Sequence, residues 1–115
     1  MSLEAIFAPQ SVAVVGASKQ PGKVGHDIFV NILKGGYTGT LYPVNPKATS
    51  IATVKCFASV LDIPDEVDLA VIILPPLAAE KAVEDSITKG VKGIVIGRPV
   101  FAKSDPKDAR LKIVS

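Results

Sequence analysis

The sequence predicts one α/β domain with a Rossmann-like, doubly wound parallel sheet of four to five strands. Three observations support this prediction. Short apolar runs alternate with helix-like segments, glycine, proline or asparagine stands at the junctions, and 115 residues suffice for one domain. Unbroken apolar runs of this kind are typical of strands buried on both faces, between two layers of helices.

The first strand and the first helix are the clearest pair of elements. Residues 12–15 form an apolar, β-branched run that stops at Gly16, which predicts a buried strand. Residues 23–34 carry apolar side chains at the spacing of one helix face, and Gly35 and Gly36 follow directly. This order predicts a strand, a turn and a crossover helix.

Three more predicted strands and helices continue the alternation. Residues 41–44 predict a second strand, weakened by Pro43, which has no amide hydrogen to donate. Residues 68–74 predict the third and strongest strand, a helix at residues 77–89 follows, and residues 94–96 predict a fourth strand. Because right-handed crossovers connect parallel strands, we expect the strands, numbered along the chain, in the order 3-2-1-4 across the sheet.

The last residues are less regular. Residues 105–110 predict a stunted helix, and residues 111–114 predict a fifth strand that extends the order to 3-2-1-4-5. We therefore expect a single domain over residues 1–115, shortened at its C-terminus, with a diverged tail at residues 98–115.

Composition argues against several classes of function. The net charge of +2 and the aromatic content of 5% argue against a nucleic-acid-binding surface. The longest apolar run, residues 69–77, is about half of what spans a bilayer, and the first eight residues lack the pattern of a signal peptide. The single cysteine, Cys56, forms no internal disulfide, and we expect it to fill space. These features predict a cytoplasmic protein that binds neither nucleic acid nor membrane.

The turn between the first strand and the first helix is the strongest candidate for a ligand site. Residues 16–25 hold three glycines, which let amide groups approach a phosphate where the helix dipole also attracts an anion. These glycines span ten residues, whereas a dinucleotide fingerprint packs three into six, and no acidic residue ends the second strand. NAD is therefore disfavoured. NADP stays open because Lys47 suits its extra phosphate, and a glycine-rich turn that binds nothing is the bland alternative.

Several motifs in a fixed order resemble the CoA-binding domain of the NDP-forming acyl-CoA synthetases. This family includes the ADP-forming acetate–CoA ligase and the α subunit of succinyl-CoA synthetase. The resemblance covers residues 3–96, and the motifs that carry it lie at residues 6–18, 21–25, 42–47, 59–65 and 67–72. Motifs that recur in the right order are far more specific than one glycine-rich loop.

The resemblance implies that coenzyme A is the cofactor and assigns a role to each matching segment. The glycine-rich loop would surround the CoA phosphates, Val44 and Lys47 would contact the nucleotide end, and residues 74–76 would border the adenine or the pantetheine arm. The implied cofactor-binding residues are Gly16, Ser18, Gly22, Lys23, Val24, Gly25, Val44, Lys47, Leu74, Pro75 and Pro76. From the residues alone, a solvated surface lysine is the favoured interpretation of Lys47, and Pro75-Pro76 is a helix-initiating turn, which is compatible with a binding role.

Two departures from the family pattern qualify the expected function. Residues 97–101 differ from the family's usual segment after the fourth strand, which puts the thiol end of the CoA site in question. The phosphorylated histidine and the ATP-grasp module that the resemblance associates with ligases have no counterpart here. His26, the single histidine, is predicted either to donate to a phosphate or to cover surface. No catalytic residue and no metal site is therefore predicted.

We expect a CoA-binding module that is not catalytic alone, as the N-terminal domain or a fragment of an ADP-forming acyl-CoA synthetase of the acetate–CoA ligase type. Its partners would be coenzyme A and the remaining ligase domains or an ATP-grasp subunit. Two alternatives stay open, namely a free-standing CoA-binding regulatory protein and an NADP-binding oxidoreductase domain. The acyl substrate and the formation of a homo-oligomer are also left open by the sequence.

Overall fold

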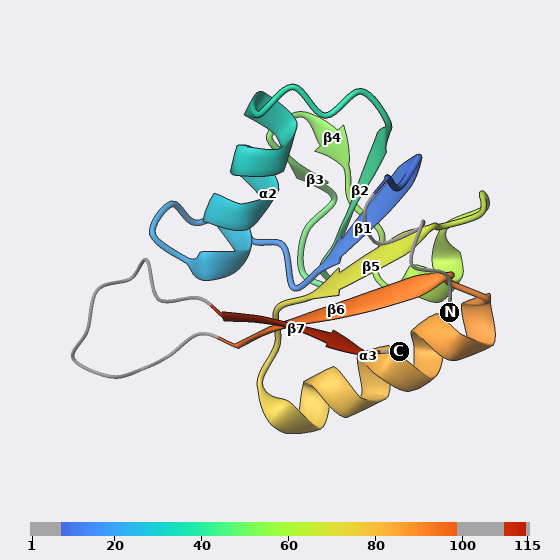
Figure 1. The fold of residues 1–115 in the computed structure, drawn as a ribbon. Coiled ribbons are helices and arrows are strands. Elements are labelled where there is room, and N and C mark those ends of the chain that lie inside the picture. Colours follow the sequence, from blue (N-terminus) through green and yellow to red (C-terminus); the bar gives the residue numbers. More distant parts are fainter. Residues whose placement is uncertain (1–7, 99–109, 115) are drawn as a thin grey trace.

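A five-stranded sheet forms the centre of the computed structural model, which describes residues 8–98 and 110–114 (Figure 1). Four strands are parallel, and the last pairs antiparallel with its neighbour. The order across the sheet is β2-β1-β5-β6-β7. The strands are β1 (Ser11–Val15), β2 (Thr40–Val44), β5 (Leu69–Ile72), β6 (Gly93–Arg98) and β7 (Arg110–Val114).

Elements cover both faces of this sheet, as the unbroken apolar runs predict. Side chains alternate along β1, so that Val12 and Val14 pack in one cluster with Phe29, while Ala13 and Val15 pack in another with Ala82. Figure 1 shows α2 and α3 on opposite sides of the sheet. The Rossmann-like α/β fold class is therefore confirmed. The covering elements are α2 (Val24–Lys34) with the hairpin β3 (Ser50–Ile51) and β4 (Val54–Lys55), and α3 (Pro76–Lys89) with the 3₁₀ turn η1 (Val60–Asp62).

The predicted strand order is wrong. Counted along the chain as in the prediction, the observed order is 2-1-3-4-5, because β5 pairs with β1 on the side opposite to β2. All four residues of β5 are buried. A position outside β2 would have made β5 an edge strand, with no neighbouring strand on one side. The predicted fifth strand is confirmed as β7, one residue longer, but it runs antiparallel to β6.

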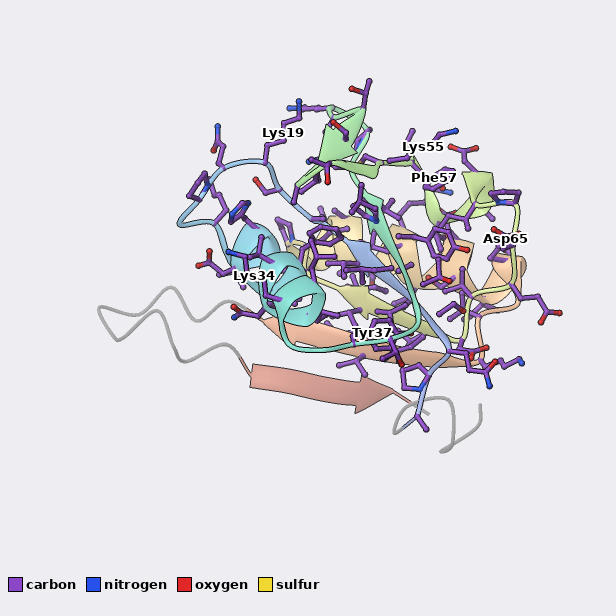
Figure 2. All side chains as sticks on the ribbon, turned by 90° about the horizontal axis from the view of Figure 1, so that it is seen from above. Lys19, Lys34, Tyr37, Lys55, Phe57 and Asp65 are labelled. Atoms are coloured by element: carbon purple, nitrogen blue, oxygen red, sulfur yellow. The ribbon has the colours of Figure 1, made fainter. Side chains whose placement is uncertain are left out.

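The proline in β2 also favours the observed order. Pro43 cannot donate to a ladder, so its strand belongs at an edge, where β2 lies. A short bridge covers part of this edge: the Phe57 amide donates to the Pro43 carbonyl and the Asn45 amide donates to the Phe57 carbonyl, both at 2.9 Å. The Lys55 ammonium lies 5.4 Å from the centre of the Phe57 ring, on the outside of this edge (Figure 2).

The helix boundaries follow the sequence signals. Prolines precede and open α3, and Gly90 ends it in the left-handed conformation with φ 88°, its amide donating to the carbonyls of Ser86 and Ile87. The helix predicted at residues 23–34 is confirmed to within one residue. The stunted helix predicted at residues 105–110 and most of the predicted tail lie outside the described residues. In the described part of the chain, no helix is both long and apolar enough to cross a bilayer.

Candidate functional site

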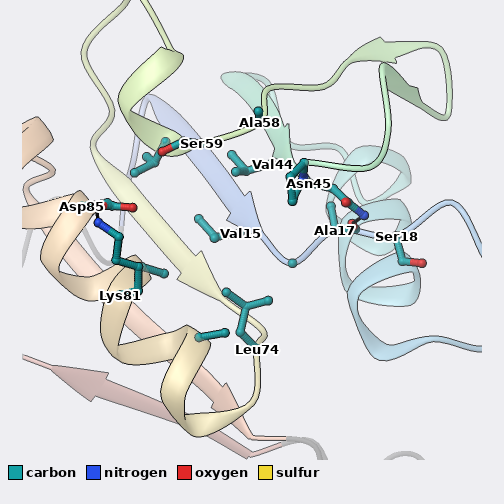
Figure 3. Close-up of a pocket in the computed structure, with 15 residues that line it drawn as sticks. Val15, Ala17, Ser18, Val44, Asn45, Ala58, Ser59, Leu74, Lys81 and Asp85 are labelled. Atoms are coloured by element: carbon teal, nitrogen blue, oxygen red, sulfur yellow. Dashed lines mark hydrogen bonds and ion pairs between the residues drawn. The ribbon is translucent and has the colours of Figure 1, made fainter.

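A pocket of about 280 Å³ opens at the carboxyl edge of the sheet, where β1, β2 and β5 end (Figure 3). Doubly wound folds bind their ligands at this edge. The turns that follow the three strands form one side of the pocket, and η1 and α3 form the other. The lining residues are Val15, Gly16, Ala17, Ser18, Val44, Asn45, Pro46, Ala58, Ser59, Val60, Leu74, Ala78, Lys81, Ala82 and Asp85.

Two glycines bring the β1–α2 turn, α2 and β5 into close contact. Gly16 has φ 101°, and a Cβ atom there would collide with the backbone carbonyl of Ile73. A Cβ atom on Gly25 would collide with the carbonyl of Gly16. The amide of Gly16 donates to the Val44 carbonyl at 3.0 Å, which fixes the turn to the end of β2. The first turn of α2 can therefore lie directly against the turn only because both positions are glycine.

Hydrogen bonds from two side chains hold consecutive carbonyl groups of this turn. Asn45 Nδ2 donates to the Ala17 carbonyl at 2.9 Å, and His26 Nδ1 lies 2.9 Å from the Ser18 carbonyl. Asn45 Oδ1 also accepts a hydrogen bond from the Lys47 amide at 2.8 Å. Asn45 comes from the end of β2 and His26 from the first turn of α2, so the turn is held from both sides.

The predicted site residues fall into two groups. Gly16, Ser18, Val44 and Leu74 line the pocket. The remaining predicted residues do not line this pocket, and they are Gly22, Lys23, Val24, Gly25, Lys47, Pro75 and Pro76.

Within the second group, the residues before α2 shape the start of the helix. The Lys23 side chain is exposed, while its carbonyl accepts hydrogen bonds from the amides of His26 and Asp27. Gly22 has φ 92°, and a Cβ atom there would meet open space. Lys47 is exposed just beyond β2, and Pro75 and Pro76 are exposed where α3 begins.

The opposite wall of the pocket contains residues that were not predicted from the sequence. Ser59 lines it and caps η1 by accepting a hydrogen bond from the Leu61 amide. Lys81 on α3 pairs with Asp85 at 2.9 Å, and the hydrogen bond to Asp85 raises the pKa of the Lys81 ammonium. A serine before a short helical turn and a lysine–aspartate pair four residues apart on a predicted helix were the available signals. Neither signal shows that the residue faces a pocket.

The single cysteine lies behind the site, as expected of a space-filling residue. Cys56 is buried in the cluster between the sheet, α2 and the hairpin. Burial raises the pKa of its thiol, which keeps the thiol protonated and weakly nucleophilic at neutral pH. No group of three or more histidine, cysteine, aspartate or glutamate side chains within the described ranges is arranged to hold a metal ion.

A family model for the CoA-binding domain matches residues 10–104, most of the chain. The chain belongs to the CoA-binding domain family. The resemblance found in the sequence is thereby confirmed, and coenzyme A is the ligand of this domain.

Relatives of the CoA-binding domain include large and small proteins. Acetate–CoA ligase [ADP-forming] II of Archaeoglobus fulgidus is 44% identical over 93% of this chain, which spans only 16% of that ligase. The apo structure of a dinucleotide-forming acetyl-coenzyme A synthetase from Ca. Korarchaeum cryptofilum has a TM-score of 0.76 and 43% identity, over 78% of this chain and 20% of that one. A conserved hypothetical protein from Pyrococcus furiosus has a TM-score of 0.68 and 34% identity, over 74% of this chain and 72% of that one.

Proposed function

We propose that the domain holds coenzyme A at the carboxyl edge of its sheet, as the CoA-binding module of an ADP-forming acyl-CoA ligase, and that it catalyses nothing alone. The observation that carries this proposal is the β1–α2 turn. Within the described residues, the amides of Ser18 and Lys19 donate to no protein acceptor, and Ser18 lines the pocket. Coenzyme A carries a pyrophosphate, and such amides stabilise an anion of this kind.

The remaining predicted residues supply contacts around this anion in the same proposal. Val44 and Leu74 provide apolar surface in the pocket, while the exposed ammonium groups of Lys23 and Lys47 are free to reach phosphates. Lys47 lies in the turn after β2, just beyond Asn45 and Pro46, which suits the 3′-phosphate of the nucleotide. A cytoplasmic location is part of the proposal, supported by a buried thiol that is free within the described part of the chain.

Titration calorimetry with coenzyme A, dephospho-CoA and NADP tests the ligand assignment and its site. We expect coenzyme A to bind more tightly than NADP, and Lys47→Ala to weaken coenzyme A several-fold while leaving dephospho-CoA unchanged, because only the former carries the 3′-phosphate. The matched control is Lys34→Ala, since Lys34 is also exposed but lies in the last turn of α2 (Figure 2). Equal affinities for coenzyme A and NADP would contradict the proposal.

The ligase assignment rests on relatives that are much longer than this chain, so it needs a separate test. We expect the purified domain to form no acyl-CoA from a carboxylic acid, ATP and coenzyme A. We expect the polypeptide that carries this sequence in cells to be several times longer than 115 residues, and to release ADP in the same assay. Thioester formation by the domain alone would contradict the assignment.

A free-standing CoA-binding regulatory protein is the second candidate function. β7 pairs with β6 along five residues, and the similar Pyrococcus furiosus protein is comparable in size, which both favour this candidate. The same measurement of polypeptide length in cells separates the two candidates, since a chain of about 115 residues supports the second.

A further inference from the structure

We propose that His26 and Asn45 are positioning residues that aim the amides of Ser18 and Lys19 at the pyrophosphate of coenzyme A. This inference rests on the proposed function, because it assigns a role to side chains around the same turn. Asn45 lines the pocket and His26 does not, but the proposed role requires neither side chain to touch the ligand. Each acts through the carbonyl that it holds.

The hydrogen bond of His26 determines the direction of one peptide group. The Ser18 carbonyl only accepts, so the proton of the hydrogen bond must sit on His26 Nδ1, 2.9 Å away. In a planar trans peptide, the carbonyl and the following amide point in opposite directions, and the described residues contain no cis bond. Holding the Ser18 carbonyl toward α2 therefore directs the Lys19 amide away from α2.

Asn45 fixes the preceding peptide group in the same way. Its Nδ2 donates to the Ala17 carbonyl at 2.9 Å, which sets the direction of the Ser18 amide. Asn45 itself is well held, because its Oδ1 accepts from the Lys47 amide and its backbone amide donates to Phe57. Figure 3 shows the Asn45 side chain reaching toward Ala17 and Ser18 at the edge of the pocket.

The physical gain is preorganisation. Without these two donors, either peptide group can rotate and turn a carbonyl dipole toward the ligand, which would repel an anion. Ser18 Oγ accepts a hydrogen bond from the Gln20 amide at 3.1 Å, so the Ser18 side chain stabilises the turn itself. Two donors from two different elements thus hold the backbone direction that the pyrophosphate needs.

A matched pair of variants tests the role of His26. In His26→Asn the amide nitrogen takes nearly the position of Nδ1, whereas in His26→Gln it lies near that of Nε2, and both side chains are neutral. We expect His26→Asn to retain the wild-type dissociation constants for coenzyme A and dephospho-CoA. We expect His26→Gln to raise both by the same factor, about five- to tenfold, because both ligands carry the pyrophosphate.

Asn45→Asp provides a second test from the other side of the turn. The carboxylate keeps the acceptor for the Lys47 amide but cannot donate to the Ala17 carbonyl. Its charge also repels the ligand, so the titration is repeated at high salt, where that repulsion is screened. We expect a several-fold loss for coenzyme A and dephospho-CoA to remain at high salt. Asn31→Ala, on the exposed part of α2, is the control.

The outcomes separate this inference from the proposed function. If the wild-type domain binds no coenzyme A, the proposed function fails. If the wild type binds coenzyme A and the His26→Gln and His26→Asn variants have equal dissociation constants, only the positioning role is wrong. Should His26→Gln not fold, as judged by its thermal transition, His26→Ala replaces it as the variant without a donor, and the same equality with His26→Asn would overturn the role.

Discussion

The parallel strands begin at one end of the sheet, the amino edge, and finish at the other, the carboxyl edge. These two ends use similar polar groups in opposite ways. At the amino edge, Ser11 Oγ donates to the Glu66 carbonyl at 3.0 Å and accepts from the Asp68 amide at 2.8 Å. The Asp68 carboxylate accepts from the Gln10 amide at 2.9 Å and lies 3.5 Å from the Lys92 ammonium. These polar groups bind one another, which closes this edge.

At the carboxyl edge, side chains bind carbonyl groups and leave amides available. Asn45 and His26 hold the carbonyls of Ala17 and Ser18, and within the described residues the next two amides have no protein acceptor. A binding edge therefore need not have more polar groups than a structural one. It needs donors left over after the protein has satisfied its own acceptors.

The largest expected effect comes from blocking the close approach at the carboxyl edge. Gly16→Ala combines a left-handed backbone with a collision against the Ile73 carbonyl, so we expect a loss of about 3 kcal/mol or more in the free energy of unfolding. Coenzyme A binding should be lost with it. Urea denaturation and calorimetry measure both quantities.

Gly36→Ala is the control for this variant. Gly36 has a similar φ of 85°, but a Cβ atom there would meet open space, so only the conformational cost of about 1–2 kcal/mol is expected. Equal destabilisation by the two substitutions would show that the close approach at Gly16 is not what fixes the turn.

An intermediate effect on stability is expected from removing the polar contacts of Asp68 at the amino edge. Asp68→Ala removes the acceptor of the Gln10 amide and the partner of Lys92, so we expect a loss of about 1–2 kcal/mol in the free energy of unfolding. The affinity for coenzyme A should not change, because this edge is remote from the pocket. A parallel loss of affinity would undermine the contrast between the two edges.

The smallest expected effect is a gradual loss of stability at alkaline pH. Burial raises the pKa values of the Cys56 thiol and of the Tyr37 and Tyr42 hydroxyls, so the folded state holds these protons more tightly than the unfolded state. The stabilisation is complete below the pKa of a free thiol, about 8.5, and is lost as the pH rises through the folded-state values. Denaturation between pH 7 and 10 measures it, and Cys56→Ala should reduce the decline.

Much of the fold could be predicted because local patterns decide it. The apolar run that forms β5 and the proline and glycine at the ends of α3 each specify one element. The strand order could not be derived with the same certainty, since a right-handed crossover allows β5 on either side of the β1–β2 pair. The edge preference of Pro43 was the signal that favoured the observed order.

The residues of the candidate site also fall into those that local sequence patterns predict and those that only tertiary packing determines. Gly16, Val44 and Leu74 could be predicted because they lie at or shortly after the ends of strands, and parallel strands bring these ends together. Ser59 and Lys81 could not, because they reach the pocket only through the way η1 and α3 pack on the sheet. That packing depends on the strand order.

The most direct test of the central claim is a ¹H–¹⁵N correlation spectrum of the domain recorded while coenzyme A is added. We expect the largest shifts at the amides of Ser18 and Lys19, smaller ones in the first turn of α2, and none at Gln10 or Asp68. Dephospho-CoA should shift the same amides. Unchanged Ser18 and Lys19 signals in a domain saturated with coenzyme A would contradict the account.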